Sequence, residues 1–191
     1  MKHLKDLILE KGFVRSEHIL DVSQFLNQQV DPQLMQSLGK NFAEYYKDYD
    51  FDAFVTVETS GIAPSVFAAL HANKPLIIIK KQNKLMDEAV YVQQTCVSFT
   101  KEVNYHLTVK KEFIQGKRLI LLDDFLAQGS VVKNVELLFN KENAQLLSTG
   151  ICISKNFQPG YLSLTEEGYD LYTQVQLKSL NPVTGKIEFV D

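Results

Sequence analysis

Two adjacent carboxylates, Asp123 and Asp124, follow the uninterrupted aliphatic run Leu119–Leu122 and precede a short loop that contains Gly129. Carboxylates in such a place can hold sugar hydroxyls or a metal ion. The chain after Gly129 has the apolar periodicity of a helix, and the first turn of a helix presents free N–H groups to an anion. Together these residues predict a site for a phosphorylated sugar.

The aliphatic run is typical of a strand that is covered on both faces, in the centre of a parallel sheet. Such sheets bind ligands beyond the carboxyl ends of their strands, which is where we expect the two acids. A strand at 54–57, a helix at 62–72 and a strand at 75–79 predict a right-handed parallel crossover earlier in the chain. With a further strand at 146–154, the fold class is α/β with a mainly parallel central sheet flanked by helices.

The ends of the chain predict smaller elements. A helix that stops near Gly12, short strands at 13–14 and 19–22, and a helix with Asp31 as N-cap and Pro32 in its first turn are expected. Residues 155–160 are interpreted as a turn-rich loop, followed by late strands at 175–180 and 186–190.

The segment Lys80–Thr95 holds three lysines and no glycine, and it has little periodicity. A polar insertion of this length is usually a functional lid or a mobile loop. Strand-like pieces at 96–100 and 105–109 follow it and predict an antiparallel excursion.

Length and composition exclude several classes of protein. With 191 residues and no linker, we expect one domain. The formal charge of −3 argues against a broad nucleic-acid surface. Cys96 and Cys152 are expected to be buried and reduced, and the four histidines are scattered without ligand spacing. No signal peptide or membrane-spanning run is found, so a cytoplasmic protein is expected.

On its own, an acid pair can simply cap a turn at the end of a strand. The complete order of strand, two acids, glycine loop and helix resembles the phosphoribosyl-diphosphate signature of the type I phosphoribosyltransferases. That resemblance implies that Asp123 and Asp124 hold the ribose hydroxyls and act as the catalytic residues. It implies a 5′-phosphate loop made of Ala127, Gln128, Gly129, Ser130 and Val131. Gln128 and Val131 stand where the family usually has threonine.

Further blocks spread over the chain resemble bacterial members of that family that act on xanthine: Ile19–Pro32, Glu58–Pro64, Asp123–Gly129 and Lys155–Gly160. The resemblance implies the type I phosphoribosyltransferase fold in a single domain, 1–191. It implies a small hood over the purine, formed by residues 1–30 and about 155–191. A homodimer is expected on the same ground.

The resemblance also assigns roles to individual residues. Pyrophosphate would be held by Glu58, Thr59, Ser60, Gly61 and Lys81, the last chosen among Lys80, Lys81 and Lys84. Xanthine would be contacted by Leu20, Asn27, Lys155 and Phe157. Mg²⁺ is expected to bind together with phosphoribosyl diphosphate, and no side chain is assigned to it as a ligand.

The expected reaction moves 5-phosphoribose from its 1-diphosphate to N9 of xanthine, which gives xanthosine monophosphate and pyrophosphate in purine salvage. Some relatives that use 6-oxopurines carry an aspartate at the position of Ala127, proposed as a base, and this chain has none there. Three alternatives stay open: a guanine or hypoxanthine phosphoribosyltransferase, a non-catalytic sensor of phosphoribosyl diphosphate, and an unrelated nucleotide-binding α/β protein.

Overall fold

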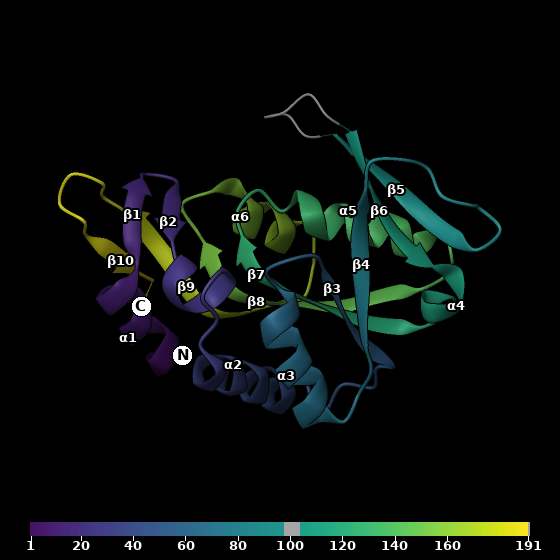
Figure 1. Cartoon of the computed structure of the whole chain (residues 1–191), viewed down its shortest axis with the longest axis horizontal. Coiled ribbons are helices and arrows are strands. Elements are labelled where there is room, and N and C mark those ends of the chain that lie inside the picture. Colours follow the sequence, from purple (N-terminus) through teal and green to yellow (C-terminus); the bar gives the residue numbers. More distant parts are fainter. Residues whose placement is uncertain (98–103, 191) are drawn as a thin grey trace.

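The computed structural model describes residues 1–97 and 104–190. The strands are β1 (Phe13–Ser16), β2 (Ile19–Asp21), β3 (Ala53–Val57), β4 (Leu76–Gln82), β5 (Tyr91–Val97), β6 (Asn104–Lys110), β7 (Arg118–Leu126), β8 (Gln145–Lys155), β9 (Leu171–Leu180) and β10 (Ile187–Phe189). Eight of them form one sheet in the order β10-β9-β8-β7-β3-β4-β6-β5 (Figure 1). The five central strands, β9 to β4 in this order, are parallel, and antiparallel strands lie at both edges. The prediction of a mainly parallel sheet is confirmed.

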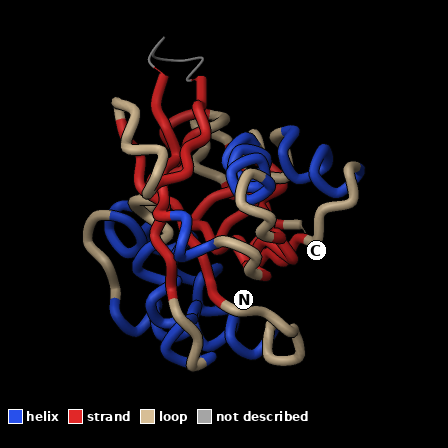
Figure 2. Tube along the Cα trace, turned by 90° about the vertical axis from the view of Figure 1, so that its right-hand side faces the viewer, coloured by secondary structure: helices blue, strands red, loops and turns tan. Residues whose placement is uncertain are grey.

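Helices cover both faces of this sheet. They are α1 (Lys2–Lys11), η1 (Ser23–Asn27), α2 (Pro32–Tyr45), α3 (Ile62–Ala72), α4 (Lys111–Ile114), α5 (Ser130–Asn140) and α6 (Pro159–Glu166). Helices α2 and α3 lie on one face, α5 and α6 on the other, and Figure 2 shows the strands between the two groups. Within the described part of the chain, no helix is both long and apolar enough to cross a membrane.

The aliphatic run of β7 is buried on both faces of the sheet. Leu119 and Leu121 belong to the apolar cluster under α5, whereas Ile120 and Leu122 belong to the cluster under α2. All four side chains are fully buried. Alternate residues of a strand point to opposite faces, so a strand between two helical layers needs apolar residues at every position.

Local signals place α2 as predicted. The Asp31 carboxylate accepts hydrogen bonds from the backbone N–H groups of Gln33 and Leu34, at 2.9 and 3.1 Å. Pro32 occupies the first helical position, where it loses no hydrogen bond. Both cysteines are free and buried, as expected.

The interpretation of residues 80–95 as a loop is wrong. Strand β4 continues through Lys80 and Lys81 to Gln82, and β5 begins at Tyr91, so only residues 83–90 lie outside strands. Antiparallel pairing of β6 with both strands stabilises this arm. Val92 and Cys96 are buried on one face of β5, but polar side chains between them weaken the period-2 signal. The predicted strand at 96–100 lies outside the described residues beyond Val97.

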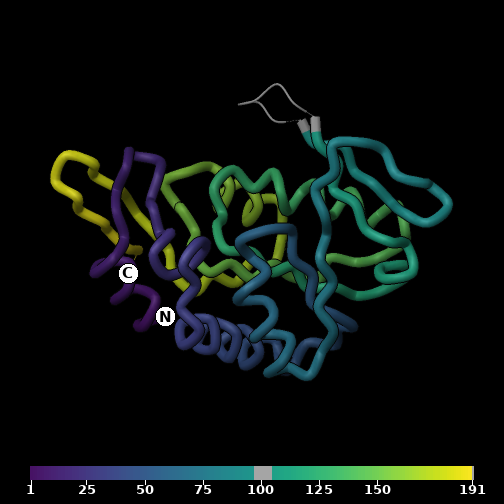
Figure 3. Tube along the Cα trace, in the orientation of Figure 1, coloured from purple at the N-terminus to yellow at the C-terminus, as the bar shows by residue number. Residues whose placement is uncertain are grey.

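Residues 155–160 are also only partly a loop. Helix α6 begins at Pro159, with proline in its first turn, and runs to Glu166. Its eight residues bury only Gly160 and Leu164, so the sequence carries almost no helical apolar stripe. The two ends of the chain lie beside each other, as Figure 3 shows, with Lys5 over the Phe189 ring at 5.1 Å from its centroid. The division into hood and core stays a prediction.

Candidate active site

The two acids lie inside β7, three and two residues before its last residue, and not beyond the strand as predicted. Pairing of β7 with β3 ends at Leu121, whereas pairing with β8 continues to Leu126. The extra length on the β8 side keeps the acids in strand geometry. On the β3 side, Asp123 and Asp124 lie beyond Leu121, the last residue of β7 that pairs with β3, so no strand in the described part of the chain covers them there.

Mutual proximity and burial govern the charge of this pair. Burial and the neighbouring charge of Asp124 raise the pKa of Asp123 well above its usual value. Burial likewise raises the pKa of Asp124, against hydrogen bonds with the Asp123 side chain and the Phe125 backbone that lower it. The backbone N–H of Asp124 donates to the Asp123 carboxylate at 3.0 Å. Hydroxyl donors or a cation within contact distance would stabilise the charged form of such a pair.

The predicted pyrophosphate loop joins β3 to α3 and contains a cis peptide bond between Glu58 and Thr59. The Glu58 carboxylate accepts a hydrogen bond from the backbone N–H of Lys81 at 2.5 Å and lies 3.5 Å from the Lys80 ammonium. Glu58 therefore fastens the loop to β4. Thr59 and Ser60 are left to line the cavity with their backbone and hydroxyl groups.

Gly61 lets this loop approach the acids. A Cβ atom there would lie 2.5 Å from the Thr56 hydroxyl oxygen and 3.0 Å from an Asp123 carboxylate oxygen. The residue must therefore be glycine for the loop to lie against the acid pair. A cavity of about 240 Å³ results, lined by Val57, Glu58, Thr59, Ser60, Lys81, Asp123, Asp124, Phe125 and Val131.

The predicted phosphate loop fills the turn between β7 and α5. Gly129 has φ of 79°, in the left-handed region that favours glycine. A second cavity of about 200 Å³ is lined by all five predicted residues, Ala127 to Val131. Asp123, Phe125 and Val131 line both cavities, so the two cavities adjoin.

The four residues predicted to contact the purine lie outside both cavity linings. Lys155 ends β8; its ammonium donates to the His18 carbonyl at 2.8 Å and lies 4.9 Å from the Phe125 ring centroid. Burial lowers the pKa of Lys155. Leu20 is buried in β2 at 5% exposure, Asn27 is exposed at the end of η1, and Phe157 packs against the α2-side core.

Two residues of the site escape sequence reasoning. Phe125 connects the two cavities with the residues predicted to contact the purine, because it lines both cavities and lies under the Lys155 ammonium. Its only signal is an aromatic directly after two acids. Gly160 packs on the phosphate loop: its N–H donates to the Ala127 carbonyl at 2.9 Å. A Cβ atom at Gly160 would lie 2.4 Å from that carbonyl oxygen. No local sequence pattern predicts this contact.

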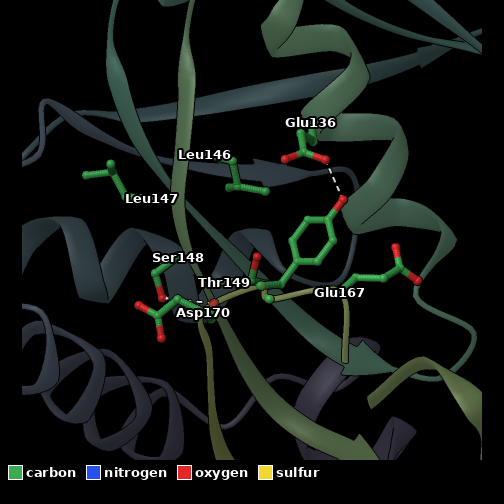
Figure 4. A pocket seen from close by; sticks show the side chains of 9 residues that line it. Glu136, Leu146, Leu147, Ser148, Thr149, Glu167 and Asp170 are labelled. Atoms are coloured by element: carbon green, nitrogen blue, oxygen red, sulfur yellow. Dashed lines mark hydrogen bonds between the residues drawn. The ribbon is translucent and has the colours of Figure 1, made fainter. Parts of the chain in front are cut away.

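A larger cavity of about 480 Å³ lies at the opposite end of the sheet, near the amino ends of β8 and β9 (Figure 4). Glu136, Glu167 and Asp170 line it, and Glu136 accepts a hydrogen bond from the Tyr169 hydroxyl. The cavity beside the acid pair also has three carboxylates, but Lys81 lines it and the adjoining cavity contains the start of α5, whereas no lysine or arginine among the described residues lines the larger cavity. This positive charge and the free helix N–H groups favour the smaller cavities as the site for an anionic sugar.

No family model matches the chain. Xanthine phosphoribosyltransferase 1 of Clostridium botulinum is 41% identical over 192 residues and covers the whole of both chains. Xanthine phosphoribosyltransferase of Agathobacter rectalis is 38% identical over 193 residues, which are 100% of this chain and 99% of the relative. That of Stutzerimonas stutzeri is 37% identical over the full length of both.

Solved structures agree on the fold. Adenine phosphoribosyltransferase from Trypanosoma brucei, in complex with AMP, pyrophosphate and ribose-5-phosphate, superposes with a TM-score of 0.72 at 19% identity, covering 91% of this chain and 79% of that one. The Rhodothermus marinus adenine enzyme gives 0.72 at 14% identity, covering 93% and 100%. With the fold shared and full-length relatives near 40% identity, the chain belongs to the xanthine phosphoribosyltransferase family.

Proposed function

We propose that this protein transfers 5-phosphoribose from 5-phosphoribosyl 1-diphosphate to N9 of xanthine, releasing pyrophosphate and forming xanthosine monophosphate. The observation that supports the proposal is the position of Asp123, which lines both cavities, and of Asp124, which lines one of them, beside the two loops proposed to bind phosphate groups. A molecule with phosphate at both ends and hydroxyls in its middle matches that order of groups. Full-length similarity to xanthine phosphoribosyltransferases supports the choice of base.

The acid pair would accept hydrogen bonds from the ribose 2′ and 3′ hydroxyls. Hydrogen bonds to charged groups contribute roughly 1.5–3 kcal/mol each, so the pair can fix the ring firmly. The 5′-phosphate would be bound by N–H groups at the start of α5, reached through Gly129 in its left-handed conformation. Gln128 and Val131 offer no hydroxyl, and Ser130 has the nearest one.

Pyrophosphate would leave toward the loop Thr59–Gly61 and Lys81. A helix N-terminus contributes only about 0.3–1 kcal/mol per charge when exposed, so a full charge is needed beside it. Lys81 supplies one, since its side chain lines the same cavity as the acids. The leaving group would then be stabilised mainly by fixed charge and position.

Mg²⁺ fits this site as a companion of the substrate. Within residues 1–97 and 104–190, no group of three or more His, Cys, Asp or Glu side chains could hold a metal ion, and Asp123 and Asp124 offer carboxylate oxygens in the cavity. When bound, Mg²⁺ would neutralise the charge of the diphosphate. We propose that phosphoribosyl diphosphate supplies most of its ligands, with Asp123 and Asp124 facing it.

The purine would lie between the phosphate loop and the β1–β2 hairpin. Lys155 would donate to the 6-oxo group, Phe157 would lend a ring face, and Asn27 can both donate and accept. Leu20, buried in β2, would contribute apolar contact or a backbone group. Because Ala127 carries no base, the acidity of xanthine itself would have to ease loss of its proton; a many-fold rise in xanthine turnover in Ala127→Asp would contradict this.

The oligomeric state and the cellular location are proposed from the resemblance to the family. We propose a homodimer in the cytoplasm, as the resemblance implies for a purine-salvage enzyme. Sedimentation of the purified protein at micromolar concentration would give twice the 21.8 kDa chain mass. A monomer at all concentrations would contradict the dimer and leave the proposed reaction untouched.

The test of function is pyrophosphate release from phosphoribosyl diphosphate and Mg²⁺ with xanthine, guanine and hypoxanthine in separate reactions. Sites that hydrogen-bond one substituent can discriminate by roughly 10⁴-fold, and we expect the highest kcat/KM with xanthine. A preference for guanine or hypoxanthine would overturn the base assignment. Absence of turnover with all three, together with absence of phosphoribosyl diphosphate binding in calorimetry, would overturn the function.

A further inference from the structure

Gln128, one of the two residues that depart from the family signature, is part of a hydrogen-bonded bridge. Its amide nitrogen donates to the Gln158 side-chain oxygen at 3.2 Å. The Gln158 amide nitrogen in turn donates to the backbone carbonyl of His18 at 3.4 Å. An amide side chain can donate and accept at once, so a chain of two glutamines can carry this bridge. A threonine at 128 has a shorter side chain and could not form the same link.

The bridge ends at the lysine assigned to the purine. The His18 carbonyl also accepts the hydrogen bond of the Lys155 ammonium, at 2.8 Å. A carbonyl oxygen has two lone pairs, and here they serve Gln158 and Lys155 together. In this state the ammonium is therefore engaged by the β1–β2 turn, and it must exchange that partner for the purine oxygen.

The backbone reinforces the same path. Gly160 donates to the Ala127 carbonyl at 2.9 Å, and its missing side chain lets the start of α6 touch the phosphate loop. The β1–β2 turn is itself fixed, since the His18 N–H donates to the Ser16 hydroxyl at 3.2 Å. Phosphate loop, α6 start and turn are thus connected through direct contacts from one half of the site to the other.

We propose that Gln128 and Gln158 are positioning residues that couple phosphate in the loop to release of Lys155 toward the purine. The inference rests on the proposed function. Charge-assisted hydrogen bonds are roughly twice as strong as neutral ones, so a bound phosphate draws the Gln128 amide away from Gln158. Gln158 can then turn fully to the His18 carbonyl and satisfy that oxygen as the Lys155 ammonium moves to the purine oxygen. Lys155 becomes free to donate to the base, and by linkage the purine favours phosphate binding equally.

The first test needs no turnover. Amide hydrogen exchange is measured in the wild type and in Gln158→Leu, with and without saturating ribose 5-phosphate. In the wild type we expect exchange to change both in the phosphate loop, 127–131, and in the turn, 16–19. In Gln158→Leu the loop should still respond and the turn should not. An unchanged turn in the wild type, or an equal response in the variant, would overturn the coupling.

The second test separates the two substrates. In Gln158→Leu we expect the KM for xanthine to rise about fivefold or more, in the range of typical couplings, because no side chain takes over the His18 carbonyl. In Gln128→Leu, Gln158 is already released without phosphate, so the KM for xanthine should stay near that of the wild type when phosphoribosyl diphosphate is saturating. Because Gln128 acts only through Gln158, the double variant should match Gln158→Leu. Gln128→Thr, which introduces the usual family residue, should behave like Gln128→Leu toward xanthine while keeping or lowering the KM for phosphoribosyl diphosphate.

Gln36→Leu, at an exposed glutamine on α2, is the matched control and should behave as wild type. A raised KM for xanthine in Gln128→Leu, a double variant more impaired than Gln158→Leu, or equal changes in both KM values would overturn the inference while the proposed function stands. If the wild type turned over no purine, the function would fall, and the exchange experiment with ribose 5-phosphate would still decide whether the coupling exists.

Discussion

The residues proposed to hold the phosphoribosyl group and those proposed to hold the purine are assembled differently. The acids and the phosphate loop come from one stretch, β7 and the turn into α5. The purine residues come from segments so distant that Lys155 and the turn it contacts are 137 positions apart. The first half is specified by local geometry, such as the left-handed Gly129. The second depends on how far-apart elements pack.

This contrast predicts different consequences of substitution in each half. Changes in the local half should affect chemistry with every purine and leave packing intact. Changes in the assembled half should affect one substrate or the stability of the contact between the halves. We expect the largest effect at the acid pair and the smallest in the pH dependence of stability.

Asp123→Asn tests the local half. We expect kcat/KM to fall roughly 100-fold with every purine, because a charge-assisted bond of about 1.5–3 kcal/mol to the ribose is weakened. The free protein should become more stable, since burial and Asp124 both disfavour the charged carboxylate. Each kcal/mol would raise Tm by roughly 2–4 °C. Asp48→Asn, an exposed change, is the control; equal activity in both variants would remove Asp123 from the mechanism.

Lys155→Met tests the assembled half. Loss of the ammonium should raise the KM for xanthine roughly 10-fold or more, as expected for a hydrogen bond from a charged group. The KM for phosphoribosyl diphosphate should change far less. Lys178→Met, at an exposed lysine of β9, serves as control. Steady-state kinetics with each substrate varied in turn give the answer, and a larger effect on the diphosphate substrate would reverse the assignment of Lys155.

Gly160→Ala tests whether the phosphoribosyl half and the purine half of the site can be changed separately, because Gly160 contacts the phosphate loop from the purine side. Its new Cβ would meet the Ala127 carbonyl oxygen at 2.4 Å and the Gly129 nitrogen at 2.6 Å. Overpacking of this kind costs about 1–3 kcal/mol, and both KM values should rise. Gly185→Ala has open space but a φ of 70°, so it should lose stability through backbone strain and keep both KM values. Urea denaturation and kinetics below the unfolding range separate the two effects.

The pH dependence of stability gives the smallest effect. The raised pKa values of Asp123 and Asp124 mean that the folded state binds more protons than the unfolded state above about pH 3.8. This contribution is present at low pH and is lost as pH rises through the folded pKa values. The stability of Asp123→Asn relative to wild type should therefore increase as pH rises from about 4. A constant difference measured by denaturation at several pH values would contradict the electrostatic account.

Much of the local half could be predicted from the sequence. Leu119–Leu122 has apolar residues for both faces of the sheet, and this pattern predicts a central strand. Gly129 predicts the start of α5. Two features could not be predicted. The acids lie within β7 because β8 keeps pairing beside them. Helix α6 is held by contacts of Gly160 with a loop about thirty positions earlier, and no periodicity within α6 reports such contacts.

The purine half was accessible only through resemblance. Asn27 is one of several exposed polar residues around η1, and Leu20 is one buried leucine among many. Gln158 and Phe125 carry no local sign of a role, because their importance lies in partners from other elements. Contacts between distant segments depend on tertiary packing, and a single sequence carries no direct sign of which residues meet.

The contact between His18 and Lys155 also has a consequence for how the chain matures. The β1–β2 turn leaves the ribosome well before Lys155 and Gln158, which follow His18 by 137 and 140 positions. Contacts at such separation form late, because loop closure must come first. During synthesis the strands that carry the acid pair can assemble while the purine half is still open. A nascent chain would thus acquire its sugar site before its base site, and it could select a purine only after Lys155 and Gln158 have reached the β1–β2 turn.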